Sequence, residues 1–464
     1  MKIALIYPPC GELHFKGYPL GLGYLFAALQ KAHDVSIYDG TGQTFHRGIR
    51  AVLADVKKKR PQVVGISFNS FNRIGAYQLI KNIKKISKDI IIVLGGVHPS
   101  TLYGQLFQYF GKQIDFIIQS EGERSFARLC DALEKGNAYA DISGLVYKNS
   151  DGEIIANSVH DVIENLDALP FPDFSYAATQ IRKRQMGYLI TSRGCPVNCA
   201  FCSTSSFWGQ KVRMNSPERI GQEVEYMKSL GAKRIFFHDD TFNLGIARTI
   251  ALADILKRAN IEYAVSCRVK PVSEEMIAKL AESGCRHIAW GVESLSDTIL
   301  KSINKRITKE DVRHAFDLCA KYTDTIATAA FCCVGVPGET EETIKETIDY
   351  FDNNIQSTHG PATSMLYILP GTKIYRDLIQ ANKFNEKIWI KSGAVYFYTY
   401  KHNIWKLNTW RKQVNRSGIR LPYTGRHFWD GISGEDEHIS SAKKRFRKII
   451  KKMIGYVHLL RNMY

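Results

Sequence analysis

The chain has 464 residues, of which 45% are hydrophobic and 23% charged, and its formal net charge is +18 at pH 7. This length suggests two or three domains, and the composition excludes a disordered or fibrous protein. The ten cysteines are too sparse for a disulfide scaffold, and no apolar run is long enough for a signal peptide or a membrane-spanning helix. We therefore expect a cytoplasmic protein with free thiols.

Short apolar runs alternate with helix-like segments through the first 135 residues: KIALIY, DVSIYD, VVGISF, IIIVLGG and DFIIQ. This alternation predicts a doubly wound parallel α/β sheet over residues 1–150. Such sheets bind ligands beyond the carboxyl ends of their strands, where glycine lets a ligand approach the backbone. The residues expected at that edge are Leu20, Gly21, Ser67, Gly95 and Gly96.

The order of these pieces resembles the cobalamin-binding domain of vitamin B12 enzymes. Many such domains carry an Asp-x-His-x-x-Gly motif whose histidine ligates cobalt from below, and the matching segment here, DGTGQT, has Thr41 in the histidine position. The resemblance implies that Thr41 and the five strand-edge residues contact cobalamin, with no histidine from this motif beneath the cobalt. His98, in GGVHPS, is a further candidate contact, and a hydrogen-bonded loop histidine is the alternative.

Residues 151–185, including NLDALPFPDF, are rich in turn signals and predict a linker. A second alternation follows over residues 186–400, with GYLITS, AKRIFFH, EYAVSC, RHIAWGV, IATAAFCCV and TSMLYIL as strands. It predicts a partial (β/α)6 barrel, whose working face is at the carboxyl ends of the strands.

The segment GCPVNCAFC places Cys195, Cys199 and Cys202 directly after the first barrel strand. Thiolates at this spacing suit zinc or an iron-sulfur cluster, but a structural zinc site needs a fourth ligand and none follows nearby. A [4Fe-4S] cluster held by three cysteines leaves one iron open. With Phe201 the segment reads Cys-x-x-x-Cys-x-aromatic-Cys, which resembles the radical S-adenosylmethionine (AdoMet) enzymes. In that family the open iron binds AdoMet, and an electron from the cluster cleaves it to a 5'-deoxyadenosyl radical.

The later strands end in residues whose counterparts in this family contact AdoMet. Carboxylates and hydroxyls suit its ammonium and ribose, and glycine backbone suits the adenine edge, although any one of these residues alone is also consistent with a strand-end cap or turn. The candidates, together with Phe201, are Asp239, Asp240, Thr241, Ser266, Arg268, Glu293, Ser294, Gly335, Pro337 and Gly338.

The domain order, the LPFP linker and the SRGCP segment resemble the cobalamin-dependent subgroup of radical AdoMet enzymes over residues 1–385. The resemblance implies methylation of an unactivated carbon in a small-molecule or lipid substrate, with a flavodoxin or ferredoxin as electron donor. Oxidation, cyclisation or C–C coupling with the same cofactors remains open, as does a non-catalytic cobalamin sensor. RNA modification is disfavoured, because the methylthiotransferases carry three further cysteines in the first domain, where this chain has only Cys10 and Cys130.

Residues 401–464 carry 15 Lys and Arg against 4 Asp and Glu, so the basic charge is concentrated in this tail. The segment KKRFRKIIKKMIGYVHLL predicts an amphipathic helix with one apolar stripe and an otherwise basic surface. Two interpretations follow: peripheral contact with an anionic membrane surface, at the inner face of the membrane, or packing of the stripe on the barrel.

Overall fold

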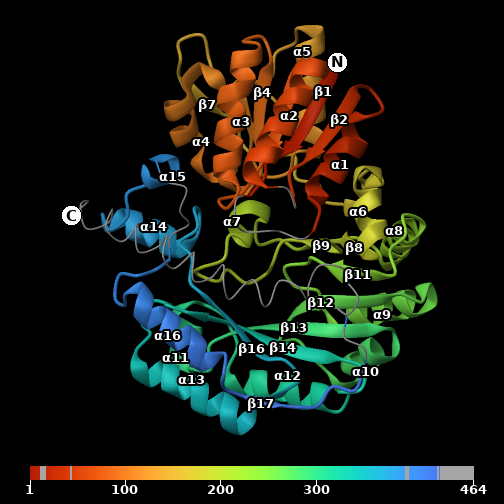
Figure 1. Cartoon of the computed structure of the whole chain (residues 1–464), viewed down its shortest axis with the longest axis vertical. Helices are drawn as coiled ribbons and strands as arrows, with labels where there is room; N and C mark the ends of the chain where they lie inside the picture. The colour runs from red at the N-terminus through yellow and green to blue at the C-terminus, as the bar shows by residue number, and fades with distance from the viewer. Residues whose placement is uncertain (11–16, 42–43, 392–396, 426–427, 429–464) are drawn as a thin grey trace.

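The computed structural model describes residues 1–10, 17–41, 44–391, 397–425 and 428. These residues form two α/β domains stacked end to end, with the carboxyl-terminal edge of the first sheet facing the second domain (Figure 1). Within this part of the chain, none of the helices combines the length and the apolar character that crossing a bilayer requires.

The first domain is built on a sheet whose strands, among the described residues, run in the order β2-β1-β3-β4-β5-β6-β7. The first five strands in sequence are parallel, and β6 and β7 add an antiparallel hairpin at one edge. This confirms the doubly wound parallel sheet, but the hairpin extends it past residue 150 into the predicted linker. The strands are β1 (Lys2–Tyr7), β2 (Asp34–Asp39), β3 (Val63–Ser67), β4 (Ile91–Gly95), β5 (Phe116–Ile118), β6 (Leu145–Lys148) and β7 (Ile154–Ala156).

Helices cover both faces of this sheet because alternate strand residues point to opposite sides. Val64 and Ile66 pack in one core with α2 (Phe45–Lys59), α3 (Arg73–Ile86) and α4 (Val97–Phe110). On the other face, Val63 and Val93 pack with α1 (Leu20–Leu29) and α5 (Glu123–Lys135). Helices thus cover both faces of the sheet. They leave the carboxyl ends of the strands accessible to a ligand.

The second domain is a parallel sheet with the strand order β16-β14-β13-β12-β11-β8 in the described part of the chain. Its outer strands are not paired to each other there, as expected for a partial barrel. The strands are β8 (Met186–Leu189), β11 (Arg234–Phe237), β12 (Glu262–Arg268), β13 (Cys285–Glu293), β14 (Ala327–Val334) and β16 (Gly360–Met365). The helices between them are α8 (Pro217–Ser229), α9 (Ile246–Ala259), α10 (Glu274–Glu282), α11 (Asp297–Ser302), α12 (Lys309–Ala320) and α13 (Glu341–Asn354).

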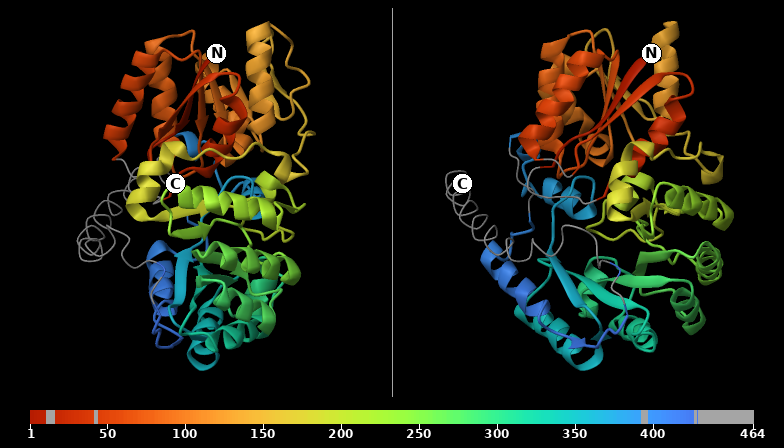
Figure 2. Two further views of the ribbon diagram at one scale, coloured as in Figure 1. Left: turned by 90° about the vertical axis from the view of Figure 1, so that its right-hand side faces the viewer. Right: turned by 45° about the vertical axis from the view of Figure 1, so that its right-hand side comes forward.

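The three-cysteine loop lies where the two domains meet. It is bracketed by the antiparallel strands β9 (Ser192–Arg193) and β10 (Arg213–Met214), and it contains α7 (Thr204–Trp208). Figures 1 and 2 show both helices at the boundary between the domains. In Figure 1, α7 lies directly beneath the first sheet and α6 (Ala178–Arg184) lies below α1. The loop is therefore part of the barrel in sequence and part of the domain interface in space.

The chain after the barrel returns to both domains. α14 (Lys373–Gln380) and α15 (Ile388–Lys391) lie near the first domain, and β15 (Gln356–Ser357) pairs with β17 (Ile419–Arg420). α16 (Ile404–Val414) buries Leu407, Trp410 and Val414 in the barrel core, so the first part of the predicted tail belongs to the folded domain. The amphipathic helix predicted over residues 443–460 lies outside the described residues.

Candidate active site

Backbone hydrogen bonds hold the three-cysteine loop on both sides. The amide of Ala200, between the last two cysteines, donates to the Ile303 carbonyl at 2.9 Å, and the Ala200 carbonyl accepts from the Ile374 amide at 3.0 Å. Gly194 has φ +95°, and a Cβ there would lie 2.5 Å from the Lys211 carbonyl oxygen, so only glycine allows the turn into Cys195. Cys195 and Cys199 are buried and Cys202 is half-buried.

The donor set fits a cluster better than a single ion. The segment GCPVNCAFCSTSSFWG contains no fourth cysteine and no histidine, whereas a structural zinc site needs four ligands. Burial raises the pKa of the Cys199 thiol, and the nearby cations of Lys305 and Arg268 oppose that shift. These cations favour bound thiolates, and the loop is thus suited to an anionic iron-sulfur cluster.

The segment after β11 contains one residue bonded to the chain that follows β8 and two residues beside the cysteine loop. Both carboxylate oxygens of Asp239 are occupied by the backbone and hydroxyl of Thr191 and by the Ser192 hydroxyl, which joins β11 to the chain after β8. Burial raises the pKa of Asp239 to about 6. Asp240 accepts from the Thr204 hydroxyl at 2.8 Å. The Thr241 hydroxyl lies 3.8 Å from the Cys195 sulfur, so the structure brings Asp240 and Thr241 to the cluster face.

Glu293, at the end of β13, has φ +71°, a backbone region that is strained for residues other than glycine. A register shift between Gly291 and Glu293 against β14 turns its side chain. Its carboxylate accepts from the buried Lys305 ammonium at 2.7 Å. Arg268 donates to the Lys305 carbonyl at 2.7 Å, and Ser266 is half-buried on the neighbouring strand. Lys305 was not among the residues predicted from the sequence, where it resembles an ordinary solvated charge.

Ser294 does not share the environment of Glu293. Its hydroxyl lies 3.2 Å from that of Thr347, on the outer helix α13, so the residue lies on the helix side of the sheet. Glu293 and Ser294 were both predicted on the cluster face, but the positive φ of Glu293 ends the extended strand there, and the Ser294 side chain lies on the helix side. Gly335, Pro337 and Gly338 form the turn after β14, with positive φ at both glycines.

The carboxylate of Glu339 closes this turn by accepting from the amides of Gly335 at 2.6 Å and Val336 at 3.0 Å. Burial raises its pKa to about 7, so between about pH 4.5 and 7 the native protein binds more protons here than the unfolded chain. This carboxyl should therefore lower the free energy of unfolding as the pH rises through that window.

We expect Glu339→Gln to remove this pH dependence while one amide oxygen still accepts both bonds. The variant should gain at most about 3 kcal/mol over the parent at pH 8 and nothing at pH 4. Urea unfolding of both proteins across this range measures the difference. An equal difference at pH 4 and pH 8 would contradict a titrating Glu339.

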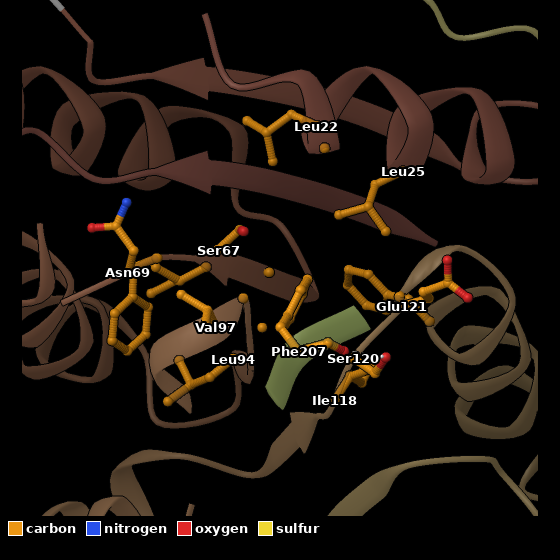
Figure 3. Close-up of a pocket in the computed structure, with 18 of the residues that line it drawn as sticks. Leu22, Leu25, Ser67, Asn69, Leu94, Val97, Ile118, Ser120, Glu121 and Phe207 are labelled. Atoms are coloured by element: carbon orange, nitrogen blue, oxygen red, sulfur yellow. Dashed lines mark hydrogen bonds between the residues drawn. The ribbon is translucent and has the colours of Figure 1, made fainter. Parts of the chain in front are cut away.

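A pocket of about 390 Å³ opens at the carboxyl-terminal edge of the first sheet (Figure 3). Among its lining residues are Gly21, Ser67, Gly95 and Gly96, four of the positions expected at this edge of the sheet. An added Cβ at Gly21 or Gly95 would have no heavy atom within 4 Å, so both glycines open onto the pocket. At Gly96 a Cβ would lie 2.5 Å from the Phe68 carbonyl oxygen. The edge thus forms a cradle of bare backbone for a large ligand.

Three predicted cobalamin contacts lie elsewhere. Leu20 packs on the barrel-side core, and Thr41 donates twice to the Asp39 carboxylate, each time at 2.8 Å. His98 is buried, with Nδ1 2.9 Å from the Ser70 hydroxyl and Nε2 3.1 Å from the Tyr77 hydroxyl, and burial lowers its pKa to about 3. No histidine is among the described residues that line the pocket.

The opposite wall of the pocket comes from the cysteine loop. Ser203, Thr204, Phe207 and Trp208, all within seven residues of Cys202, line the pocket together with Asp240. Phe207 projects from α7 towards Ser120 and Ile118 of the first domain (Figure 3), and the Ser120 hydroxyl donates to the Phe207 carbonyl at 3.0 Å. The pocket therefore lies between the strand ends and the helix that follows the last cysteine.

A buried group of charges, which the sequence analysis missed, joins the domains beside this pocket. Arg193 of β9 donates at 2.6 Å to both Glu121 and Glu123, and its β10 partner Arg213 donates at 2.6 Å to Glu121. Burial raises the pKa of Glu121, but the two guanidinium groups outweigh it and hold the pKa below its usual value. The only signal in the sequence was the position of Arg193 before the cysteine loop.

Comparison with known proteins assigns a family model to each domain. Residues 9–130 match the B12 binding domain, and residues 189–351 match the radical SAM superfamily. An uncharacterised methyltransferase of Pyrococcus horikoshii is 32% identical over 406 residues, which cover 85% of this chain and 87% of the relative. The anaerobic magnesium-protoporphyrin IX monomethyl ester cyclase of Rubrivivax gelatinosus is 27% identical over 75% of this chain and 62% of its own length.

The fold also has a counterpart among solved structures. The radical S-adenosylmethionine methyltransferase TsrM of Kitasatospora setae, solved with cobalamin and a [4Fe-4S] cluster bound, superimposes with a TM-score of 0.68. The match covers 82% of this chain and 75% of TsrM at 22% sequence identity, and it therefore shows a shared fold.

Proposed function

Because the chain belongs to the cobalamin-dependent radical S-adenosylmethionine family, we propose that it methylates an unactivated carbon of a small-molecule substrate. The observation that carries the proposal is the shared wall of the pocket. Thr204, Phe207 and Trp208 close the candidate cobalamin pocket from the loop that carries Cys195, Cys199 and Cys202. One stretch of chain thus borders both cofactor sites.

In this proposal Cys195, Cys199 and Cys202 hold the [4Fe-4S] cluster, and Gly21, Ser67, Gly95 and Gly96 contact cobalamin. When bound, the cluster and AdoMet supply hydrogen-atom abstraction from carbon, and cobalamin supplies the methyl group. Residues 1–150 would serve as the cobalamin-binding unit and residues 186–400 as the radical unit.

The remaining candidates surround AdoMet at the strand ends. In this proposal Asp240, Thr241 and Glu293 would accept from the ammonium or ribose hydroxyls, and the ion pair of Lys305 with Glu293 would hold that carboxylate in position. In the turn after β14 the exposed Gly338 would offer bare backbone to the adenine, whereas Gly335 is buried against the Leu407 side chain. Asp239 and Ser294 act as supports in this proposal, because their side chains are occupied by protein groups.

We further propose a flavodoxin or ferredoxin as the electron donor, since cleavage of AdoMet consumes one electron. The basic residues after 428 would then be available for an anionic partner, and a membrane surface is the second candidate. Co-sedimentation with phosphatidylglycerol vesicles tests the membrane contact. It compares the full-length protein with a form that lacks residues 440–464. Equal sedimentation of both forms would exclude it.

Methyl transfer is tested by anaerobic reconstitution with iron, sulfide and cobalamin, followed by mass spectrometry of cell extract incubated with deuterated-methyl AdoMet. The expected product is a metabolite heavier by one deuterated methyl group, formed with S-adenosylhomocysteine and 5'-deoxyadenosine. The similarity to the Rubrivivax cyclase favours one alternative, ring closure or oxidation without methyl transfer. That alternative predicts 5'-deoxyadenosine and a modified metabolite that carries no deuterium.

The pocket lining predicts how the cobalt is ligated from below. In the described part of the chain, Thr41 occupies the position of the usual histidine and is bonded to Asp39, and His98 is enclosed by Ser70 and Tyr77. We therefore expect the electron paramagnetic resonance spectrum of bound cob(II)alamin to lack nitrogen splitting. A nitrogen-split spectrum would show that a histidine or the cobalamin base occupies the lower face.

A further inference from the structure

We propose that Arg193 is a positioning residue that couples occupancy of the cobalamin pocket to the geometry of the cysteine loop. The inference rests on the proposed function, because it concerns the relation between the two cofactor sites. It assigns a role to a buried charge network that neither the motif nor the pocket alone explains.

Arg193 contacts three segments of the chain that contribute to the pocket wall. Its guanidinium donates to Glu121 and Glu123, which both line the pocket, at 2.6 Å each. The same group is 5.1 Å from the ring centroid of Tyr24 in α1 and 5.1 Å from that of Trp208 in α7. One side chain thus contacts the loop between β5 and α5, the first helix of the cobalamin domain and the helix after the last cysteine.

The backbone of Arg193 leads directly into the cysteine loop. Only Gly194 separates it from Cys195, and the close contact of Gly194 with Lys211 leaves that link little freedom. Arg193 is also paired with Arg213, which closes the loop on its other side and donates to the same Glu121. A shift of Glu121 and Glu123 would therefore move both ends of the loop together.

The network is suited to select one arrangement. Two carboxylates and two guanidinium groups balance in charge, and all four side chains are at most 8% exposed. Removing one member leaves a buried charge without its partner, whereas a buried network in good geometry fixes register and orientation. Arginine suits this position better than lysine, because its planar fork donates to two carboxylates in a fixed geometry.

Coupling of this kind is reciprocal. If the pocket and the loop share one arrangement, building the cluster must tighten cobalamin binding by the same factor by which cobalamin favours the loop geometry that binds the cluster. The ratio of the hydroxocobalamin dissociation constants without and with the cluster therefore measures the coupling. It requires no turnover.

The test is equilibrium dialysis of hydroxocobalamin against the full-length protein under anaerobic conditions, with the cluster removed or reconstituted. The unmodified protein should bind at least about fivefold more tightly with the cluster. The double variant Arg193→Met with Glu123→Gln removes one positive and one negative charge, so the remaining pair of Glu121 and Arg213 stays balanced. Its ratio should fall to near one.

Two further variants keep the test sharp. Arg124→Ala removes an exposed ion pair with Asp161 in the adjoining turn of α5 and should keep the full ratio. Arg193→Lys keeps the charge and should give an intermediate ratio. It provides the measurement if the double variant fails to fold. A ratio near one in the unmodified protein, or an unchanged ratio in both Arg193 variants, would overturn the coupling. Absence of hydroxocobalamin binding to any form would instead contradict the proposed function.

Discussion

Replacing any one of Cys195, Cys199 and Cys202 with alanine is expected to abolish formation of 5'-deoxyadenosine from AdoMet. In a [4Fe-4S] cluster with one open iron, each of the other three irons is held by one thiolate. Loss of any one thiolate therefore destabilises the cluster and removes the electron source. We expect a fall of at least about 10³-fold, equivalent to about 4 kcal/mol of activation free energy. Iron content, visible absorbance and chromatography of the nucleoside products measure the effect.

A matched control is available in the barrel. Cys319 is 2% exposed in α12, in the hydrophobic core among the outer helices. Cys319→Ala should lower the free energy of unfolding about as much as the loop variants do. It should leave AdoMet cleavage intact. Continued nucleoside formation in the Cys195, Cys199 or Cys202 variants would remove the basis of the enzymatic assignment.

Gly95→Leu is expected to weaken cobalamin binding about tenfold to hundredfold without unfolding the protein. Gly95 is the last residue of β4, its φ is not positive, and its Cβ direction is open for at least 4 Å. A leucine there would fill the pocket, and overpacking of this kind costs about 1 to 3 kcal/mol, or roughly a tenfold to hundredfold loss of affinity. Equilibrium dialysis with hydroxocobalamin and thermal unfolding measure the two effects separately.

The neighbouring glycine provides the contrasting case. At Gly96 φ is +95° and a Cβ would collide with the Phe68 carbonyl, so Gly96→Ala should lower the free energy of unfolding by about 1 to 3 kcal/mol. The folded Gly96→Ala protein should bind cobalamin with the affinity of the parent, so any loss of binding should match the unfolded fraction. Unchanged cobalamin binding by Gly95→Leu would show that the ligand binds outside this pocket.

Strand positions followed from the sequence wherever apolar residues coincide with the hydrogen-bonded ladder, as at KIALIY and EYAVSC. The last barrel strand is the exception, because TSMLYIL was predicted to pair whereas the ladder joins Gly360–Met365 to β14. Leu366 and Ile368 instead belong to the core that packs beneath the cysteine loop. Hydropathy reports burial, and burial at this point comes mainly from residues of α11, α14 and α15, which lie outside the sheet.

Roles at single positions depended on direction, which a linear pattern does not contain. Ser294 follows Glu293 in the motif but contacts the opposite side of the sheet, and Thr41 and His98 are occupied by neighbouring groups beside the pocket. Lys305 carried no local signal, and the only signal for Arg193 was its position before the cysteine loop, because a buried charge and a solvated one look alike until the partner is known.

The sequence by itself determined the chemistry: three thiols in a tight loop, glycines at strand ends and the order of two α/β units. These are local properties, set by residue type, spacing and backbone freedom. The tertiary structure alone decided that α7 closes the candidate cobalamin pocket and that Arg193 joins the two sites. Both depend on contacts between segments about 70 or more residues apart, and such contacts exist only when the packing of two domains excludes water and pairs the buried charges.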